Sequence, residues 1–207
     1  MIAMNFIMKH YAKKVTPQVK LGQVQRKNRW DVTPNYYNTP QKYPVFDKEK
    51  PGKGYRHIIR KQDLFKFTEI VPEWDKLAKG LRAVVLSAAD YYQLGWHNKG
   101  VVGICAWEKE IQWHDCSDEF YEEHKGIFEK LNIECSEKET GYFIEFDEAS
   151  AKAFQLIHIF IHELGHHHDR MTTRSKQAAV RGEKYAENYA KRFEDIIIEE
   201  YQNVFNF

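Results

Sequence analysis

No stretch of the sequence approaches the roughly 20 consecutive apolar residues that a membrane-spanning helix needs, so we expect no membrane partner. The first nine residues include a short apolar segment, but no basic residue precedes it and no small-residue cleavage pattern follows, so we expect no signal peptide. The three cysteines, Cys105, Cys116 and Cys135, form no CxxC pair and cannot all pair with one another. They favour free thiols in a reducing compartment, and the predicted location is cytoplasmic.

Internal repeats and low-complexity tracts are also absent, and the formal net charge is only +1. Apolar residues make up 43% of the chain and charged residues 29%, which is typical of a globular protein with one ordinary core. The small net charge conceals an asymmetry. Residues 1–62 contain fourteen Lys or Arg and three acidic residues, a net charge of +11, whereas the remainder carries −10.

Residues 1–54 contain five of the six prolines and interleave aromatic with basic residues, which predicts an extended or turn-rich N-terminal arm. The chain is therefore divided into this arm and a domain over residues 55–207. Six aromatic residues from Trp30 to Tyr55 are costly to leave in water, which favours an arm packed on its own acidic domain. The alternative is that the arm binds nucleic acid, although it matches no known nucleic-acid-binding motif.

The remaining patterns predict an α+β fold, with a few strands followed by two long helices. Strands are predicted at residues 81–86, 100–107, 110–113 and 142–146, the second and third as a hairpin. Helices are predicted at residues 68–79, 118–131, 149–168 and from 175 to about 201. The helix at 149–168 is apolar on nearly every face, so we expect it to be buried. The strand at 142–146 either belongs to the core or binds substrate backbone as an edge strand.

His162-Glu163-Leu164-Gly165-His166 is an HExxH motif. Residues four apart lie one helical turn apart on the same face, so both imidazoles can reach one Zn²⁺. Glu163 lies about 100° further round the helix, where it flanks the metal and can take a proton from a water whose pKa the metal lowers. The alternative is a histidine-rich surface helix. The apolar context disfavours it, because burying two unpaired imidazoles would cost considerable free energy.

A catalytic zinc usually has three protein ligands, so a third must be sought outside the motif. The longer HExxHxxxxxH pattern is excluded, because the position that would need a histidine is Thr172. His167, His168 and Asp169 lie too close along the helix to face the same metal. We expect them to form the polar C-terminal end of the helix, where histidines suit the helix dipole.

The downstream segment 182–190 offers better candidates, because Glu183, Ala186, Glu187 and Ala190 share one helical face. The small alanines allow this helix to approach the HExxH helix closely. We expect Glu183 to be the third ligand and Glu187 to accept the free N–H of a ligating histidine. Two alternatives stay open: an ordinary charged face with a Glu187–Lys191 pair, or Glu187 as ligand with Glu183 outside. Candidate donors to a transition-state oxyanion are His158, His167 and Tyr185.

HExxH followed by a helical ExxxE resembles the gluzincin class of zinc peptidases. The combination of HELGHH with E-x-x-A-x-x-Y-A is similar to the ImmA/IrrE-type metallopeptidase family over about residues 140–195. The resemblance implies a zincin-like domain with a small sheet, a buried HExxH helix and a second long helix that supplies a Glu ligand. It assigns His162, His166 and Glu183 as ligands and Glu163 as the base. Glu187 stands where that family has Asn, the gap between the motifs is shorter, and no helix-turn-helix precedes the domain.

These features predict a cytoplasmic zinc peptidase that hydrolyses a peptide bond of a protein or peptide substrate through a metal-activated water. The alternative is a zincin-like binding or regulatory module whose basic N-terminal arm engages nucleic acid or a protein partner. Glu163 favours the enzyme, because a purely structural zinc site has no use for a general base.

Overall fold

The computed structural model describes residues 19–20, 23–24, 36–37, 39, 41–90, 93–174 and 180–207. The chain separates into two compact units, Met1–Asn35 and Tyr36–Phe207. In the smaller unit, the described residues form an antiparallel ribbon of β1 (Val19–Lys20) and β2 (Gln23–Val24). The larger unit begins at Tyr36, so the boundary predicted at residue 54 falls inside it.

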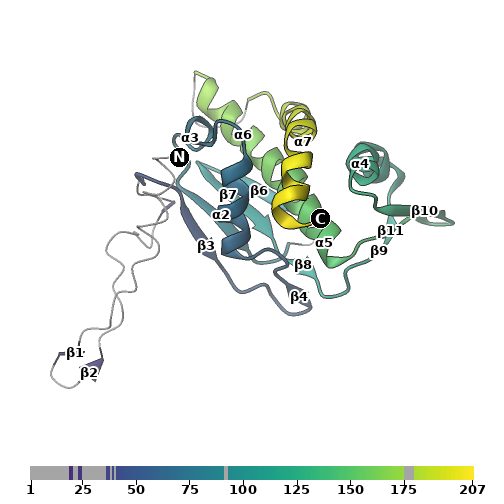
Figure 1. The fold of residues 1–207 in the computed structure, drawn as a ribbon, viewed down its shortest axis with the longest axis horizontal. Coiled ribbons are helices and arrows are strands. Elements are labelled where there is room, and N and C mark those ends of the chain that lie inside the picture. Colours follow the sequence, from purple (N-terminus) through teal and green to yellow (C-terminus); the bar gives the residue numbers. More distant parts are fainter. Residues whose placement is uncertain are drawn as a thin grey trace. The chain divides into compact units, whose positions relative to one another are not determined.

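A four-stranded mixed sheet of order β3-β5-β7-β6 lies at the centre of the larger unit (Figure 1). Its strands are β3 (Val45–Lys48), β5 (Ala83–Ser87), β7 (Val101–Cys105) and β6 (Gly95–Asn98). The first three run parallel, and β6 runs antiparallel to β7 at the edge. Every residue of β5 and β7 is buried, as expected of central parallel strands with continuous apolar sequences.

The hairpin predicted for residues 100–107 and 110–113 was wrong. Strand β7 pairs with β5 and β6, and the short β8 (Trp107–Glu108) pairs with β4 (Tyr55–Arg56). A separate antiparallel sheet of order β10-β11-β9 contains β9 (Trp113–Cys116), β10 (Glu134–Lys138) and β11 (Gly141–Glu145). The strand predicted at 142–146 is thus the middle strand of this sheet, and its Ile144 is fully buried.

Four helices flank these sheets: α2 (Lys61–Ile70), α3 (Trp74–Leu77), α4 (Asp118–Lys130) and the long α7 (Glu183–Phe205). Helix α4 agrees with the helix predicted at 118–131 and begins where the Ser117 hydroxyl accepts a hydrogen bond from the Phe120 amide. The single helix predicted at 68–79 was wrong, because Val71 precedes a proline and adopts an extended conformation that ends α2. Residues 175–179, where the last helix was predicted to start, lie outside the described residues.

The helix that carries HExxH runs from Glu148 to Thr172 in three segments. These are α5 (Glu148–Ala153), the π-helical segment η1 (Phe154–Phe160) and α6 (Ile161–Thr172). Asp147 caps its start by accepting a hydrogen bond from the Ser150 amide at 2.6 Å. All seven residues of η1 are buried, which confirms the prediction of a buried helix. The Gln155 amide in η1 donates to the Cys105 carbonyl at 2.8 Å and ties this segment to the end of β7.

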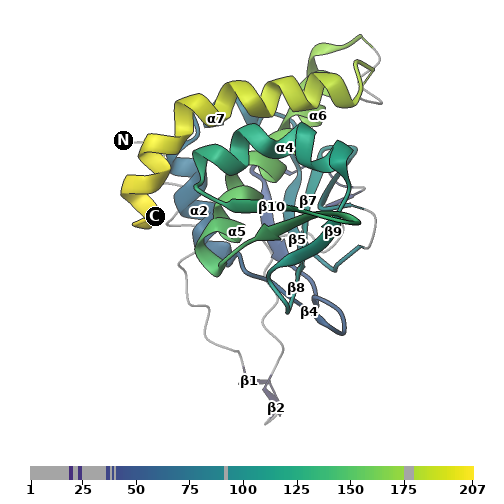
Figure 2. The ribbon, with the colours of Figure 1, turned by 90° about the vertical axis from the view of Figure 1, so that its right-hand side faces the viewer.

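Helices α6 and α7 lie side by side in both ribbon views (Figures 1 and 2). A Cβ atom added at Gly165 would lie 2.9 Å from Ala186 Cα and 3.0 Å from Tyr189 Cβ. Ala186 and Ala190 of α7 are completely buried. The two helices therefore approach closely because glycine and alanine occupy the facing positions.

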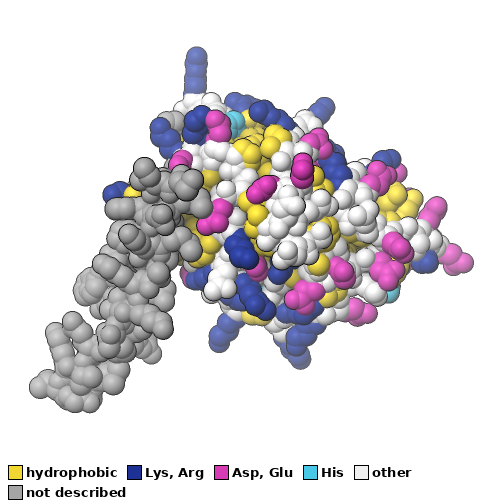
Figure 3. Space-filling model, in the orientation of Figure 1, with side chains coloured by type: hydrophobic (Ala, Val, Ile, Leu, Met, Phe, Trp, Pro, Cys, Tyr) yellow, Lys and Arg dark blue, Asp and Glu magenta, His cyan; other side chains and the backbone are white. Residues whose placement is uncertain are grey.

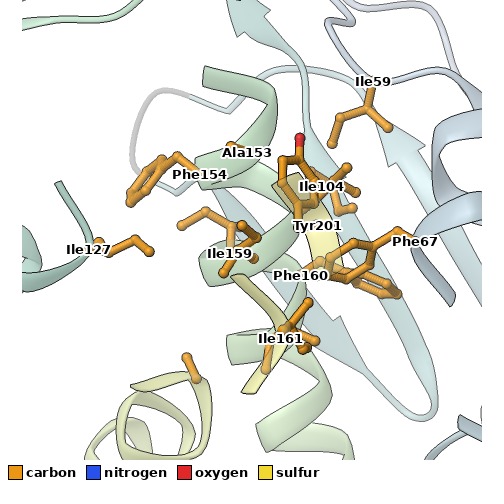
Figure 4. Close-up of a cluster of buried hydrophobic side chains, with 14 of the residues drawn as sticks. Ile59, Phe67, Ile104, Ile127, Ala153, Phe154, Ile159, Phe160, Ile161 and Tyr201 are labelled. Carbon is orange, nitrogen blue, oxygen red and sulfur yellow. The ribbon is translucent and has the colours of Figure 1, made fainter. Parts of the chain in front are cut away.

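Aromatic side chains from three helices meet in the core. The ring of Phe67 in α2 lies 5.9 Å from Phe160 in η1 and 6.2 Å from Tyr201 in α7, measured between centroids (Figure 4). Of the aromatic residues predicted to pack from the arm, Tyr36 and Phe46 are buried, Tyr43 and Tyr55 are partly buried, and Trp30 lies outside the described residues. For Tyr37 the prediction was wrong, because its side chain is 37% exposed. None of the helices in the described ranges combines the length and hydropathy that crossing a bilayer requires.

Candidate metal centre and cleft

His162, His166 and Glu183 come together where α6 faces the first residue of α7. The Nε2 atoms of His162 and His166 lie 3.1 Å and 3.2 Å from the same carboxylate oxygen, Glu183 Oε2. The three ligand atoms fall within 4.8 Å of one another, so these side chains could hold a metal ion. Two imidazoles and one carboxylate are also a donor set found in catalytic zinc sites. These three side chains therefore fit the zinc ion that the sequence predicts.

Glu163 lies beside this cluster and is only 6% exposed. A Cβ atom added at Gly95 in β6 would lie 2.8 Å from Glu163 Oε1. The absence of a side chain at Gly95 therefore provides the space that the Glu163 carboxyl group occupies. Burial raises the pKa of Glu163 to about 8, with a contribution from Glu183 and an opposing one from His162. A carboxyl group with this pKa is suited to accept and return a proton near neutral pH.

Glu187 lies one turn along α7 from Glu183 and faces the other nitrogen of His162. Its Oε2 atom lies 3.3 Å from His162 Nδ1, and its Oε1 atom lies 2.9 Å from Lys191 Nζ. A carboxylate only accepts hydrogen bonds, so this contact holds the proton on Nδ1 and leaves Nε2 free to bind a metal. Burial alone would raise the pKa of Glu187, but the hydrogen bond from His162 and the charges of His158 and Lys191 lower it to about 2.

Opposing effects act on the two HExxH histidines. Burial lowers the pKa of His162, but the hydrogen bond to Glu187 and the neighbouring Glu163 carboxylate outweigh it, and the net shift is upward. Burial lowers the pKa of His166, and Glu183 only partly opposes that effect. Burial therefore keeps His166 in the neutral, metal-binding form more readily than His162.

A series of contacts between buried polar side chains continues beyond Glu187. His158 Nε2 lies 3.5 Å from Glu187 Oε2, and His158 Nδ1 lies 2.7 Å from Glu194 Oε1. Lys130 of α4 then lies 3.0 Å from Glu194 Oε2. Glu194 was not predicted from the sequence, and His158 was predicted only as a candidate oxyanion donor. Histidines repeat every four positions at 158, 162 and 166. This spacing could have indicated that His158 lies on the same helical face as the two HExxH histidines.

His158 also belongs to a second group of potential ligands, with His162 and Glu187. In that arrangement His162 would have to bind through Nδ1, the atom that faces Glu187. The ammonium group of Lys191 on Glu187 disfavours a second cation there. The contacts of these residues match a hydrogen-bonded support for His162 better than a second metal site.

The residues that follow the motif are not the polar helix end that we expected. His167 is 1% exposed with its Nε2 atom 3.1 Å from the Lys79 carbonyl, and Asp169 is completely buried and accepts from the Arg181 amide at 2.7 Å. His168 Nδ1 lies 2.7 Å from the Tyr185 hydroxyl. In the described part of the chain, none of the three joins a group of potential metal ligands.

A cleft of about 1250 Å³ opens over the His162–His166–Glu183 cluster. Residues of η1 and α6 line it, including Glu163, and β6 and β9 contribute to its walls. Among the described strands, β6 pairs only with β7, so its other edge is available for a further strand. No residue of β11 lines the cleft, so the edge-strand interpretation of residues 142–146 was wrong. Of the three oxyanion candidates, only His158 lines it.

Comparison of the chain with known proteins gives no match to a protein-family model, a curated protein or a solved structure.

Proposed function

We propose that the protein is a zinc-dependent peptidase of the gluzincin type, which resembles the ImmA/IrrE-type family in its motifs. His162, His166 and Glu183 would hold the metal, as the resemblance assigns them. The observation that carries the proposal is the convergence of these three ligand atoms beside a buried Glu163, all lining a large cleft. A structural site has no need of a titratable carboxyl group beside its ligands or of an open cleft above them.

A bound zinc would supply Lewis acidity, polarising the scissile carbonyl and lowering the pKa of the attacking water. Glu163 takes the proton from that water and returns it to the leaving amine, a role that its raised pKa suits. Glu187 holds the tautomer of His162 that presents Nε2 to the cluster. The open edge of β6, which lines the cleft beside Glu163, binds the substrate backbone by strand addition.

A binding or regulatory module would also use the metal ligands, but it would leave Glu163 without a role. The burial of that carboxyl group beside the ligands supports the peptidase.

The proposal is tested first by metal analysis of the purified protein. Zinc should be present at about one ion per chain and should be lost in His162→Ala and in His166→Ala. The Thr172→Ala variant provides a matched control on the same helix, since the Thr172 hydroxyl donates to the His168 and Asp169 carbonyls of its own helix. Equal zinc content in all four proteins would contradict the assignment of the ligands.

A further inference from the structure

The walls of the cleft carry an uneven charge. Outside the His162–His166–Glu183 cluster and its neighbours Glu163 and Glu187, five carboxylates and one lysine line it: Asp90, Glu108, Glu110, Asp115, Glu123 and Lys99. No other Lys or Arg lines the cleft within the described part of the chain. Low-dielectric walls that carry one sign of charge concentrate ligands of the opposite sign.

Helix α4 turns one of its faces to the cleft. Phe120, Glu123 and His124 line it and are spaced as neighbours on one helical face. The adjacent residues are engaged elsewhere: Tyr121 stacks on Tyr142 at 3.8 Å, and Glu122 pairs with Lys125. Figure 3 shows Asp and Glu side chains over the region where Figure 1 places α4 and the β10–β11 strands. Glu123 therefore contributes its charge to the cleft, whereas Glu122 does not.

Aromatic rings form the apolar part of the same wall. Trp113 stacks on the buried Trp107 at 4.4 Å, and Phe120 packs edge-on against Trp113 at 5.7 Å. All three side chains line the cleft, and Trp113 and Phe120 are only partly buried. Such a surface accepts a large apolar side chain, and the faces of its rings attract cations.

Glu163 is an independent sign that this cleft receives a ligand. The side chain is 6% exposed and lines the cleft, and no hydrogen bond or ion pair engages its carboxyl group among the described residues. A carboxyl group in this position takes its hydrogen bonds from a water or a ligand in the cleft.

We infer that the cleft takes a peptide segment with Lys or Arg side chains next to a large aromatic or aliphatic residue. This substrate class rests on the proposed function. The basic side chains face the carboxylates of β8 and α4, and the apolar side chain lies against Trp113 and Phe120. The charges are at the exposed rim, so the preference weakens as salt shortens the range of the interaction.

Binding is measured with the zinc-loaded Glu163→Gln protein, so that no turnover intervenes. Two labelled peptides of equal length are compared by fluorescence anisotropy: one with lysines flanking a phenylalanine, and one with glutamates in their place. The lysine peptide should bind about tenfold more tightly at low salt. The ratio should fall towards one at 0.5 M salt, and replacing the phenylalanine by glycine should weaken binding in both peptides.

Charge reversal identifies the residues responsible. In the same Glu163→Gln background, Glu108→Lys together with Glu123→Lys should abolish the preference for the lysine peptide. The matched control is Glu122→Lys, one residue away on α4 but outside the cleft, which should leave the preference intact.

Equal binding of the two peptides, or an equal effect of the Glu122→Lys control, would overturn the inferred substrate class. The proposed function is tested by a different result: it fails if the zinc-loaded wild-type protein hydrolyses no peptide in a mixed digest. Hydrolysis without a preference for basic sites would overturn only the substrate class.

Discussion

His158 Nδ1 lies 2.7 Å from Glu194 Oε1, and each of these side chains is only 1% exposed. The pair fixes the imidazole ring of His158 in η1 against α7. The opposite nitrogen of the ring faces Glu187, whose carboxylate holds His162. The orientation of His162, a proposed metal ligand, thus depends on the Glu194 carboxylate three contacts away.

Removal of Glu194 should therefore weaken metal binding, although this residue is not a ligand. We expect Glu194→Ala to lower zinc affinity by about 10–100-fold, the range found for residues that orient ligands, and Glu194→Gln to lower it less. Competition with a chromophoric chelator measures the affinity. Asp195→Ala is the control, because Asp195 also pairs with Lys130 but is 72% exposed. Equal losses in Glu194→Ala and Asp195→Ala would argue against the positioning role.

Glu183 and Glu187 of α7 should respond differently to substitution. Glu183→Ala removes a proposed ligand and should abolish stable zinc binding, whereas Glu187→Ala should only weaken it. A structure of the zinc-loaded protein should place a Glu183 oxygen at about 2.0–2.2 Å from the metal. A Glu187 oxygen at that distance instead would refute the assignment and leave the zinc site itself intact.

The contact between α6 and α7 should not tolerate a side chain at position 165. A Cβ there would lie 2.9 Å from Ala186 Cα, so Gly165→Ala should decrease the free energy of unfolding by roughly 1–3 kcal/mol. Gly126 in α4 has no atom within 4 Å of its added Cβ, and Gly126→Ala should stabilise the protein by roughly 0.5–1 kcal/mol. Urea unfolding of the two variants tests this, and a Gly165→Ala protein as stable as wild type would contradict it.

Acid should destabilise the metal-free protein through His124. Burial and the neighbouring His158 lower the pKa of His124 to about 4, against about 6.5 in an unfolded chain. As the pH falls from about 6.5 to 4, the unfolded chain takes up the proton first, so stability present at neutral pH is lost. The loss from this histidine is on the order of 3 kcal/mol.

His124→Asn keeps a donor near the Phe120 carbonyl, which lies 2.8 Å from His124 Nδ1, but removes the titrating group. Urea unfolding at several pH values should show a shallower loss of stability in this variant than in wild type. The loss will not vanish, because burial also lowers the pKa of His97 to about 3 and of His167 to about 4. Identical pH profiles for the two proteins would refute the role given to His124.

The sequence predicted the elements whose signals are local. Helix α4 follows from its helical spacing, and the buried character of the HExxH helix follows from its apolar faces. The π-helical turns of η1 were not predicted, because apolar spacing does not distinguish them from an α-helix. The shared face of Glu183 and Glu187 was also readable, because i, i+4 spacing fixes it.

The walls of the cleft depend on long-range pairing and were not predicted. Strand β6 has the sequence Gly-Trp-His-Asn, which shows no clear alternation of apolar and polar residues, and only its register with β7 sets Gly95 beside Glu163. Parallel pairing of β3 with β5 likewise joins segments almost 40 positions apart. Such contacts leave no periodic signal in a single sequence.

The most direct test of the account is hydrolysis of a proteome digest by the zinc-loaded wild-type and Glu163→Gln proteins, with new termini counted by mass spectrometry. Glu129→Gln, an exposed position on α4, serves as the control. At matched zinc content, we expect the wild-type protein and the control to cleave peptides, and Glu163→Gln to be slower by about 10²–10⁴-fold. Cleavage by Glu163→Gln at the wild-type rate would contradict the central claim that Glu163 is the general base of a zinc peptidase.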